Sequence, residues 1–117
     1  MKIIGTGIDI VEVKRIKRVI AGNKAFLARV FTPGEIDYCA GKANKYQHYA
    51  VRFAAKEAIL KALGSKGIAL KDISIRNLDS GQPQVVLSGR LKKLEKNIVI
   101  SLSHSNDYAV AQAIYSR

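Results

Sequence analysis

Two acidic residues in different surroundings are the first candidates for chemistry. Asp9 follows a short apolar run, and Glu57 lies in a segment rich in Ala, Leu and Lys. Two carboxylates, completed by phosphate oxygens and water, form an ordinary shell for Mg²⁺. Lys61 and His104 can neutralise phosphate charge in a transfer reaction, and Arg52 is a further nearby cation. The spacing does not show that Asp9 approaches Glu57, so this chemistry requires the first strand to end beside the helix of Glu57.

The same residues also have a plainer interpretation. Glu57 and Lys61 are four positions apart on one helix face, where an exposed ion pair contributes about 0.2–0.5 kcal/mol. Such pairs are common on helix surfaces, and spacing alone favours this interpretation. An acid at the end of a strand, such as Asp9, is most often a helix cap or a turn residue. Spacing therefore leaves the structural and the catalytic role of each residue open.

Other catalytic arrangements find little support. A Ser–His–Asp site would combine a serine beside His104 with Asp107, but those serines lie on extended chain without a glycine-flanked nucleophile turn. One Cys and two His without ligand spacing cannot supply the usual zinc ligands. The chain also lacks the glycine-rich phosphate-binding motifs of dinucleotide and P-loop proteins. A hydrolase triad, a zinc site and a glycine-rich nucleotide loop are therefore disfavoured.

The helix that carries Glu57 is predicted to open at Asn44 and to continue to Leu63. Residues 52–64 are dominated by Ala, Leu, Lys and Glu, which are strong helix formers. Gly64 follows the last apolar residue, where a left-handed C-terminal cap is expected. An apolar stripe at helical spacing consists of Ala50, Val51, Phe53, Leu60 and Leu63.

The N-terminal residues 2–10 are predicted to form a strand, followed by a helix over residues 11–21. Gly5 and Gly7 either loosen this strand or permit another segment to approach it closely. One face of the strand carries Ile4, Ile8 and Ile10.

Turn and capping residues divide the rest of the chain. Thr32, Pro33 and Glu35 form a helix start with a capping box. The remaining predicted elements are a short helical segment at 26–31, a helix at 33–41, strands at 71–78, 84–88, 97–104 and 107–115, and a short helix at 89–96. Helices first and strands later predict an α+β fold, a compact single domain over residues 1–117 with a mostly antiparallel sheet packed against a long helix.

The composition is that of one folded domain with an anionic partner. The chain has 117 residues, 48% of them hydrophobic, and a formal net charge of +11, so nucleic acid, an acidic protein or a polyphosphate are candidate partners. Its apolar runs are too short to span a membrane, and its N-terminus does not follow the plan of a signal peptide. The single Cys39 is expected to be a reduced thiol. We expect a cytoplasmic protein without a membrane partner.

Four motifs in order resemble those of the holo-acyl-carrier-protein synthases, the small class of 4′-phosphopantetheinyl transferases. They are residues 7–12 with Arg15 and Ile16, residues 31–35, residues 52–58 with 61–64, and residues 101–105 with Tyr108 and Ala109. The third motif is highly specific, and the resemblance covers nearly the whole chain.

The resemblance implies a reaction and a set of site residues. Such enzymes transfer the 4′-phosphopantetheine moiety from coenzyme A to a serine of apo acyl carrier protein, using Mg²⁺ and releasing adenosine 3′,5′-bisphosphate. They assemble as homotrimers with active sites between subunits. By motif, the metal ligands are Asp9 and Glu57, the catalytic residues are Glu57, Lys61 and His104, and the residues near coenzyme A are Arg52, Lys61, Gly64, Ser65, Pro83 and His104. The base for the serine proton stays open between Glu57 and a metal-oriented water.

A basic helix face is the candidate docking surface for the acidic carrier protein. This face contains Lys14, Arg15 and Arg18, with Val19 and Phe26 as apolar anchors. Such a surface would raise the association rate in a salt-dependent way. Core packing is an equally open role for the two apolar residues, and the basic cluster has an ordinary solvated helix face as its alternative.

Two rival functions remain to be weighed. The sequence pI near 10 is compatible with a small nucleic-acid-binding protein, although the chain has few aromatic residues and no recognised binding motif. A non-catalytic trimer that only binds coenzyme A is the second rival. The four ordered motifs favour the transferase and a function without nucleic acid.

Overall fold

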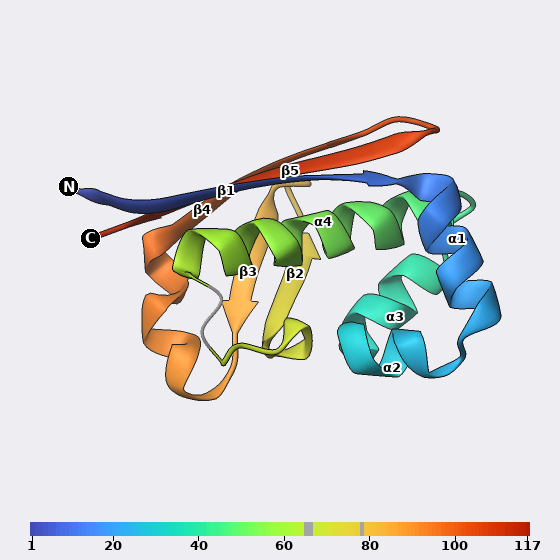
Figure 1. Ribbon diagram of the computed structural model, residues 1–117, viewed down its shortest axis with the longest axis horizontal. Helices are drawn as coiled ribbons and strands as arrows, with labels where there is room; N and C mark the ends of the chain where they lie inside the picture. The colour runs from blue at the N-terminus through green and yellow to red at the C-terminus, as the bar shows by residue number, and fades with distance from the viewer. Residues whose placement is uncertain (65–66, 78) are drawn as a thin grey trace.

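A three-stranded antiparallel sheet and one long helix form the centre of the fold (Figure 1). Strands β1 (Ile3–Glu12), β5 (Tyr108–Ser116) and β4 (Ile98–His104) lie in the order β1–β5–β4. Helix α4 (Lys45–Leu63) runs along one face of this sheet. The computed structural model describes residues 1–64, 67–77 and 79–117. The predicted α+β fold with an antiparallel sheet against a long helix is confirmed.

Shorter elements flank the two ends of α4 in Figure 1. Beside its N-terminal half lie α1 (Val13–Gly22), α2 (Ala25–Val30) and α3 (Pro33–Ala40). Towards its C-terminal half lie the 3₁₀ helix η1 (Leu70–Asp72), the hairpin of β2 (Ile73–Asn77) and β3 (Pro83–Leu87), and the 3₁₀ helix η2 (Gly89–Asn97). The strand predicted from residue 71 begins two residues later, because η1 occupies its start.

The predicted helix ends are confirmed by their hydrogen bonds and dihedral angles. The backbone N–H of Glu35 donates to Thr32 Oγ1 over 3.3 Å, and the N–H of Thr32 donates to Glu35 Oε1 over 3.0 Å. This capping box starts α3 as the sequence indicated. At the end of α4, Gly64 adopts a φ of 86°, a left-handed conformation that favours glycine.

Helix and sheet approach each other closely because small residues line their contact. A Cβ atom added at Gly5 would collide with the backbone oxygen of Ala62, and one added at Gly7 would collide with that of Ala58. Facing alanines continue this contact on β5, namely Ala109, Ala111 and Ala113, all fully buried. Of the two roles that the sequence left open for these glycines, the structure shows the close approach of another segment.

The opposite face of the same sheet is apolar and exposed. Ile8 and Ile10 of β1 are 63% and 65% exposed, and Val99 of β4 is 62% exposed. We call this surface, with Ile4 and Tyr108, the outer sheet face. The isoleucines of β1 thus point away from α4, because the helix packs against the opposite face of the strand, which carries the glycines.

The boundary between the first strand and the first helix differs from its prediction. Strand β1 runs to Glu12 and α1 begins at Val13, two residues later than the predicted helix 11–21. Asp9 pairs with Ala111 inside the ladder, and Glu12 occupies the N-cap without a side-chain cap bond. The interpretation of Asp9 as a helix cap was therefore wrong, because strand pairing with β5 continues past it.

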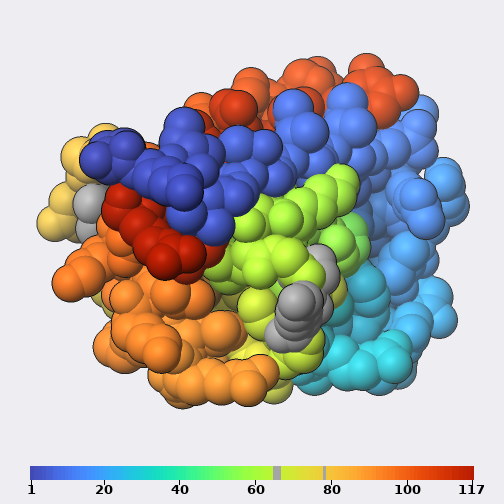
Figure 2. Space-filling model, turned by 60° about the vertical axis from the view of Figure 1, so that its left-hand side comes forward, coloured from blue at the N-terminus to red at the C-terminus, as the bar shows by residue number. Residues whose placement is uncertain are grey.

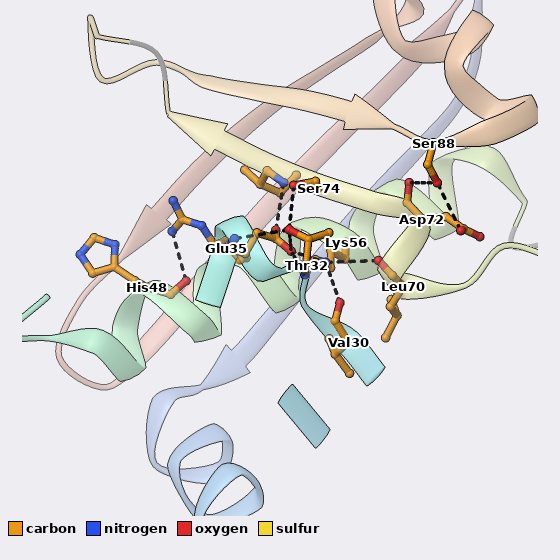
Figure 3. A network of polar contacts seen from close by, with 11 residues as sticks. Val30, Thr32, Glu35, His48, Lys56, Leu70, Asp72, Ser74 and Ser88 are labelled. Carbon is orange, nitrogen blue, oxygen red and sulfur yellow. Dashed lines mark hydrogen bonds and ion pairs between the residues drawn. The ribbon is translucent and has the colours of Figure 1, made fainter. Parts of the chain in front are cut away.

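A buried ion pair fastens the short elements to α4 (Figure 3). Lys56 Nζ lies 2.6 Å from Glu35 Oε1, and the two side chains are 0% and 1% exposed. The ammonium also donates to the backbone oxygens of Val30 and Leu70, over 2.6 and 3.2 Å. Glu35 Oε2 accepts the N–H of Ile75 over 2.9 Å. Burial lowers the pKa of Lys56, and the charge of Glu35 opposes that shift.

The two ends of the chain lie side by side. The backbone N–H of Lys2 donates to the oxygen of Arg117 over 2.9 Å, and the N–H of Arg117 returns a bond of the same length. In the space-filling view of Figure 2, the dark blue N-terminal residues cross beside the dark red C-terminal residues and lie over the green surface of α4. Pairing of the first strand with the last one closes β1 onto α4, and this positions Asp9.

Candidate functional site

Asp9 and Glu57 converge on one cavity within a single chain. The cavity holds about 320 Å³, and its lining includes both acids together with Arg15 and Phe53. Asp9 reaches it from the β1 face that packs on α4, and Glu57 reaches it from α4 itself. The condition set by the sequence, that the first strand pass beside the long helix, is therefore met.

The electrostatics of this pair are those of two anions in close proximity. Burial raises the pKa of Glu57 first, the negative charge of Asp9 raises it further, and Lys61 partly opposes the shift. Lys61 Nζ lies 3.4 Å from Asp9 Oδ1 and donates to the backbone oxygen of Ile8 over 2.8 Å. Among the residues that the structure describes, the Glu57 side chain has neither a hydrogen bond nor an ion pair. A cation entering the cavity would thus meet an unpaired carboxylate.

The predicted exposed ion pair between Glu57 and Lys61 does not form. The ammonium of Lys61 instead bonds to Asp9 and to the backbone of β1. A helix-surface pair of this spacing is weak, so the tertiary contact with β1 determines where the ammonium lies. Lys61 therefore links the long helix to the strand that carries the other acid.

His104 belongs to a second cluster. Its Nδ1 lies 2.8 Å from Gln47 Oε1, and its ring centroid is 5.6 Å from that of His48. A cavity of about 320 Å³ is lined by His104, His48, Arg52 and Pro83, among others. Burial lowers the pKa of His48 first, and the charges of Arg52, His104 and Lys42 lower it further. Asp107 is not bonded to His104, so the disfavoured hydrolase triad is absent from these residues.

Arg52 is buried beneath this second cavity. Its guanidinium donates to the backbone oxygen of His48 over 3.3 Å and to Asn77 Oδ1. The guanidinium carbon lies 4.4 Å from the centroid of the Tyr38 ring, a cation–π geometry. Its Nε is buried without a hydrogen-bond partner in the described part of the chain. The guanidinium of Arg52 therefore places a fixed positive charge beside the cavity that His104 also lines.

The two clusters lie on opposite sides of the fold. Asp9 lies on β1 and His104 on β4, the two edge strands of the sheet, so two strand spacings, about 10 Å, separate them across the sheet. Because α4 has about 3.6 residues per turn, Glu57 and His48 project from opposite sides of it. The two cavities share no lining residue. A single chain therefore does not bring Lys61 and His104 together.

Two further predicted coenzyme A residues lie in separate parts of the fold. Gly64 caps the C-terminal end of α4, one turn beyond Lys61. Pro83 begins β3 and lines the His104 cavity. Ser65 lies outside the described residues.

Three of the five predicted docking residues line the acidic cavity. Lys14, Arg15 and Arg18 are exposed on α1, and Arg18 Nη2 lies 3.7 Å from Glu12 Oε1. Val19 and Phe26 are half-buried and line the cavity with Arg15. Phe26 also contacts the rings of Phe31 and Phe53, with centroids 6.2 and 6.0 Å away. The apolar pair thus contributes both to packing and to the cavity wall.

Two polar groups of the site were not identified from the sequence. Gln47 contacts His104, and Asn77 accepts a bond from Arg52. Both contacts join residues far apart in the chain, so periodicity carries no signal of them. The sequence offers one weak signal for Gln47: it is a polar residue in the first turn of a helix that is otherwise predicted to pack.

The described part of the chain limits the other kinds of site. It contains no group of three or more His, Cys, Asp and Glu side chains that could hold a metal ion by themselves. None of its helices has the length and apolar character needed to cross a bilayer. Cys39 is fully buried. Asp9 and Glu57 therefore form a pair of carboxylates without a third such side chain from the described residues.

Comparison with known proteins identifies the family. Residues 5–113 match the model of the 4′-phosphopantetheinyl transferase superfamily. The holo-(acyl-carrier-protein) synthase of Geobacter sulfurreducens is 45% identical over 124 aligned positions, covering 98% of this chain and 98% of that protein.

Solved structures of similar sequence have the same fold. A holo-(acyl-carrier-protein) synthase from Bacillus anthracis in complex with CoA (3′,5′-ADP) matches with a TM-score of 0.82 and 34% identity, covering 98% of this chain and 97% of that one. The Helicobacter pylori synthase in complex with coenzyme A matches with a TM-score of 0.82 and 32% identity, covering 95% and 99%. The chain therefore belongs to the 4′-phosphopantetheinyl transferase superfamily.

Proposed function

We propose that this chain transfers the 4′-phosphopantetheine moiety from coenzyme A to a serine of apo acyl carrier protein, releasing adenosine 3′,5′-bisphosphate. The observation that carries the proposal is the convergence of Asp9 and Glu57 on one cavity beside Lys61. The named activities of the relatives and the coenzyme A complexes of the neighbours support the same reaction. Residues 1–117 would act as one transferase domain in the cytoplasm, where a lone thiol such as Cys39 stays reduced.

The two carboxylates fit Mg²⁺. Glu57 is a partly buried carboxylate without a partner among the described residues, and it lies close enough to Asp9 for their charges to repel. Hard oxygen donors of this kind, supplemented by phosphate and water, suit Mg²⁺. When bound, the ion would neutralise charge on the pyrophosphate as a Lewis acid. Asp9 and Glu57 are the residues that would hold it.

The chain's own cations would act on the transferred group. The serine Oγ attacks the β-phosphorus of coenzyme A, and the bond from that phosphorus to the bridging oxygen breaks. Lys61, with a half-exposed side chain, would stabilise charge on the phosphoryl oxygens, and His104 would do so on the leaving bisphosphate. Arg52 would add a fixed positive charge near coenzyme A. Glu57 or an ordered water would take the serine proton.

A homotrimer with sites between subunits would unite the two clusters. Because β1 and β4 are opposite edges of the sheet, head-to-tail contact in a closed ring would bring the β1 edge of one subunit to the β4 edge of the next. The exposed outer sheet face supplies the apolar surface that such an assembly would cover. In this arrangement Asp9, Glu57 and Lys61 come from one subunit and His104 and Arg52 from its neighbour.

The acidic carrier protein would dock on α1. Arg15 lies at the cavity rim, and Lys14 and Arg18 are exposed beside it. Val19 and Phe26 would give the carrier an apolar contact next to the acids. A carrier serine delivered over this surface would arrive beside Asp9 and Glu57.

The reaction class is tested by mass spectrometry of apo acyl carrier protein. Incubation with the purified chain, coenzyme A and Mg²⁺ should add the mass of one phosphopantetheine group to the carrier. A carrier whose serine is replaced by alanine is the matched control and should gain nothing. An unchanged mass of the intact carrier, with an active reference transferase in parallel, would refute the proposal.

A further inference from the structure

Gln47 holds His104 through a contact between the first turn of α4 and the end of β4. Gln47 Oε1 lies 2.8 Å from His104 Nδ1, which is within hydrogen-bond distance. The two residues are 57 positions apart in the chain. Gln47 does not line the cavity that His104 lines, so it contacts the imidazole from outside that cavity.

The neighbours of Gln47 fix which way its amide points. Gln47 Nε2 donates to Asn106 Oδ1 over 3.1 Å, and Asn44 Nδ2 donates to Gln47 Oε1 over 3.4 Å. An amide oxygen only accepts and an amide nitrogen only donates. In this arrangement the amide nitrogen of Gln47 faces Asn106 and its oxygen faces His104.

This orientation determines the proton on the imidazole. Since Gln47 Oε1 can only accept, His104 Nδ1 must carry the hydrogen that it donates. In a neutral imidazole the other nitrogen, Nε2, then has a free lone pair. Nε2 has no hydrogen-bond partner among residues 1–64, 67–77 and 79–117. It is thus the nitrogen left for a ligand in the cavity.

We propose that Gln47 is a positioning residue, which holds His104 in the Nδ1–H form and turns Nε2 toward the cavity shared with Arg52 and Pro83. The kinetic part of this inference rests on the proposed function, whereas the tautomer does not. The charged or titratable groups near His104 include His48, whose ring is tilted by 57° to that of His104, and Arg52, which lines the same cavity. Arg52 and Lys42 are also the cations that act on His48. His48 is held toward its neutral form by burial and by these cations, so it adds little competing charge.

The consequence is that His104 can exchange a proton without turning. Nδ1–H donates to Gln47 whether the ring is neutral or cationic, because both nitrogens carry hydrogens in the cation. Gain or loss of the second proton therefore takes place at Nε2 alone. An anionic oxygen of coenzyme A would accept a hydrogen bond from Nε2–H in the cationic state, whereas the neutral state offers that oxygen no donor.

Nitrogen-15 NMR of the imidazole rings tests the tautomer directly. The chain has only two histidines, so a His48→Phe variant assigns both. At about pH 8, where an ordinary imidazole is neutral, His104 should show a protonated Nδ1 and an unprotonated Nε2. Gln47→Met should shift the proton toward Nε2, while Gln47→Glu, which keeps an acceptor, should retain it on Nδ1. Gln84→Met, at an exposed position of β3, is the matched control and should change nothing.

Steady-state kinetics give the functional counterpart. Gln47→Met should lower kcat/KM for coenzyme A roughly tenfold, by analogy with the lower end of the loss when a partner that orients a metal-bound imidazole is removed, and Gln47→Glu should restore part of it. A wild-type His104 protonated on Nε2, or an unchanged proton position in Gln47→Met, would overturn the inference even if activity fell. If the tautomer pattern holds but the wild type transfers nothing, the positioning role stands and the proposed function fails.

Discussion

Lys61 of α4 and Asp9 of β1 lie 3.4 Å apart, from Nζ to Oδ1, although 52 positions separate them in the chain. The same ammonium donates to the backbone oxygen of Ile8. These bonds join the first strand to the long helix one turn beyond Glu57. The two acids therefore meet inside one chain, and a neighbouring chain is not needed to bring them together.

Neutralising either acid should abolish most of the transfer. We expect Glu57→Gln and Asp9→Asn each to lower kcat by about 100-fold or more, the scale of losing one preorganised electrostatic group. Carrier modification measured by mass spectrometry over a Mg²⁺ titration gives the rate, and thermal unfolding monitors the fold. Asp37→Asn, on exposed α3 surface, should behave as wild type. Near-normal turnover in either acid variant would contradict the metal role.

Reversing one charge at the docking surface should slow encounter with the carrier. We expect Arg15→Glu to raise KM for apo acyl carrier protein about tenfold at low salt and less at high salt, because exposed charges are screened. Lys93→Glu, on exposed η2, makes the same change in net charge at a distant position. Equal effects of the two variants would point to net charge alone and against docking on α1.

A charge on the outer sheet face should prevent assembly. Ile8 is 63% exposed in the single chain and does not line the acidic cavity, and we expect Ile8→Glu to yield monomers by light scattering after size exclusion. Activity should fall with it, since the Asp9 and His104 clusters would no longer meet. Ala28→Glu, on exposed α2, should leave the assembly unchanged. A trimeric Ile8→Glu protein would show that this face is not part of the interface.

Removing the buried ammonium should destabilise the fold. Lys56→Met leaves Glu35 as an uncompensated buried charge, which typically costs about 3–5 kcal/mol. Urea unfolding followed by circular dichroism measures this loss in the free energy of unfolding. Lys93→Met, at an exposed site, should cost less than about 0.5 kcal/mol. A loss that small for Lys56→Met would show that Glu35 is stabilised by its backbone bonds alone.

Burial should protect Cys39 from alkylation. Desolvation raises the pKa of this thiol from 9.0 to about 11, with the charge of Arg52 acting in the opposite direction. The thiolate is the reactive form, so iodoacetamide should modify the native protein slowly at neutral pH and the urea-unfolded chain rapidly. Mass spectrometry of the intact protein counts the adducts. Equal rates in the two states would contradict the buried location.

The same shift sets an alkaline limit on stability. The unfolded thiol loses its proton near pH 9.0 and the folded one near 11, so between these values the folded state binds more protons. The free energy of unfolding should therefore fall as pH rises through this window. Cys39→Ala removes this contribution and should show a shallower fall in urea titrations. An identical slope in both proteins would assign the alkaline loss to other groups.

Local chemistry allowed much of the chain to be predicted. The capping box of Thr32 and Glu35, the left-handed end of α4 at Gly64 and the turn between β4 and β5 each depend on neighbours within a few positions. The predicted end of the first strand just after Asp9 was wrong. Strand pairing with β5, which joins the two ends of the chain, extends β1 beyond the point that the local sequence indicates.

The sequence by itself determined the start of α3 and the end of α4, the order of strands and helices, and the residue types available for phosphate chemistry. Only the tertiary structure decided that the glycine face of β1 is buried while Ile8 and Ile10 are exposed. It also decided that Lys61 bonds Asp9, and that Gln47 holds His104 on the far edge of the sheet. Such contacts arise from strand register and from how closely a helix can approach a sheet. Both depend on packing between distant segments, which periodicity along the chain does not encode.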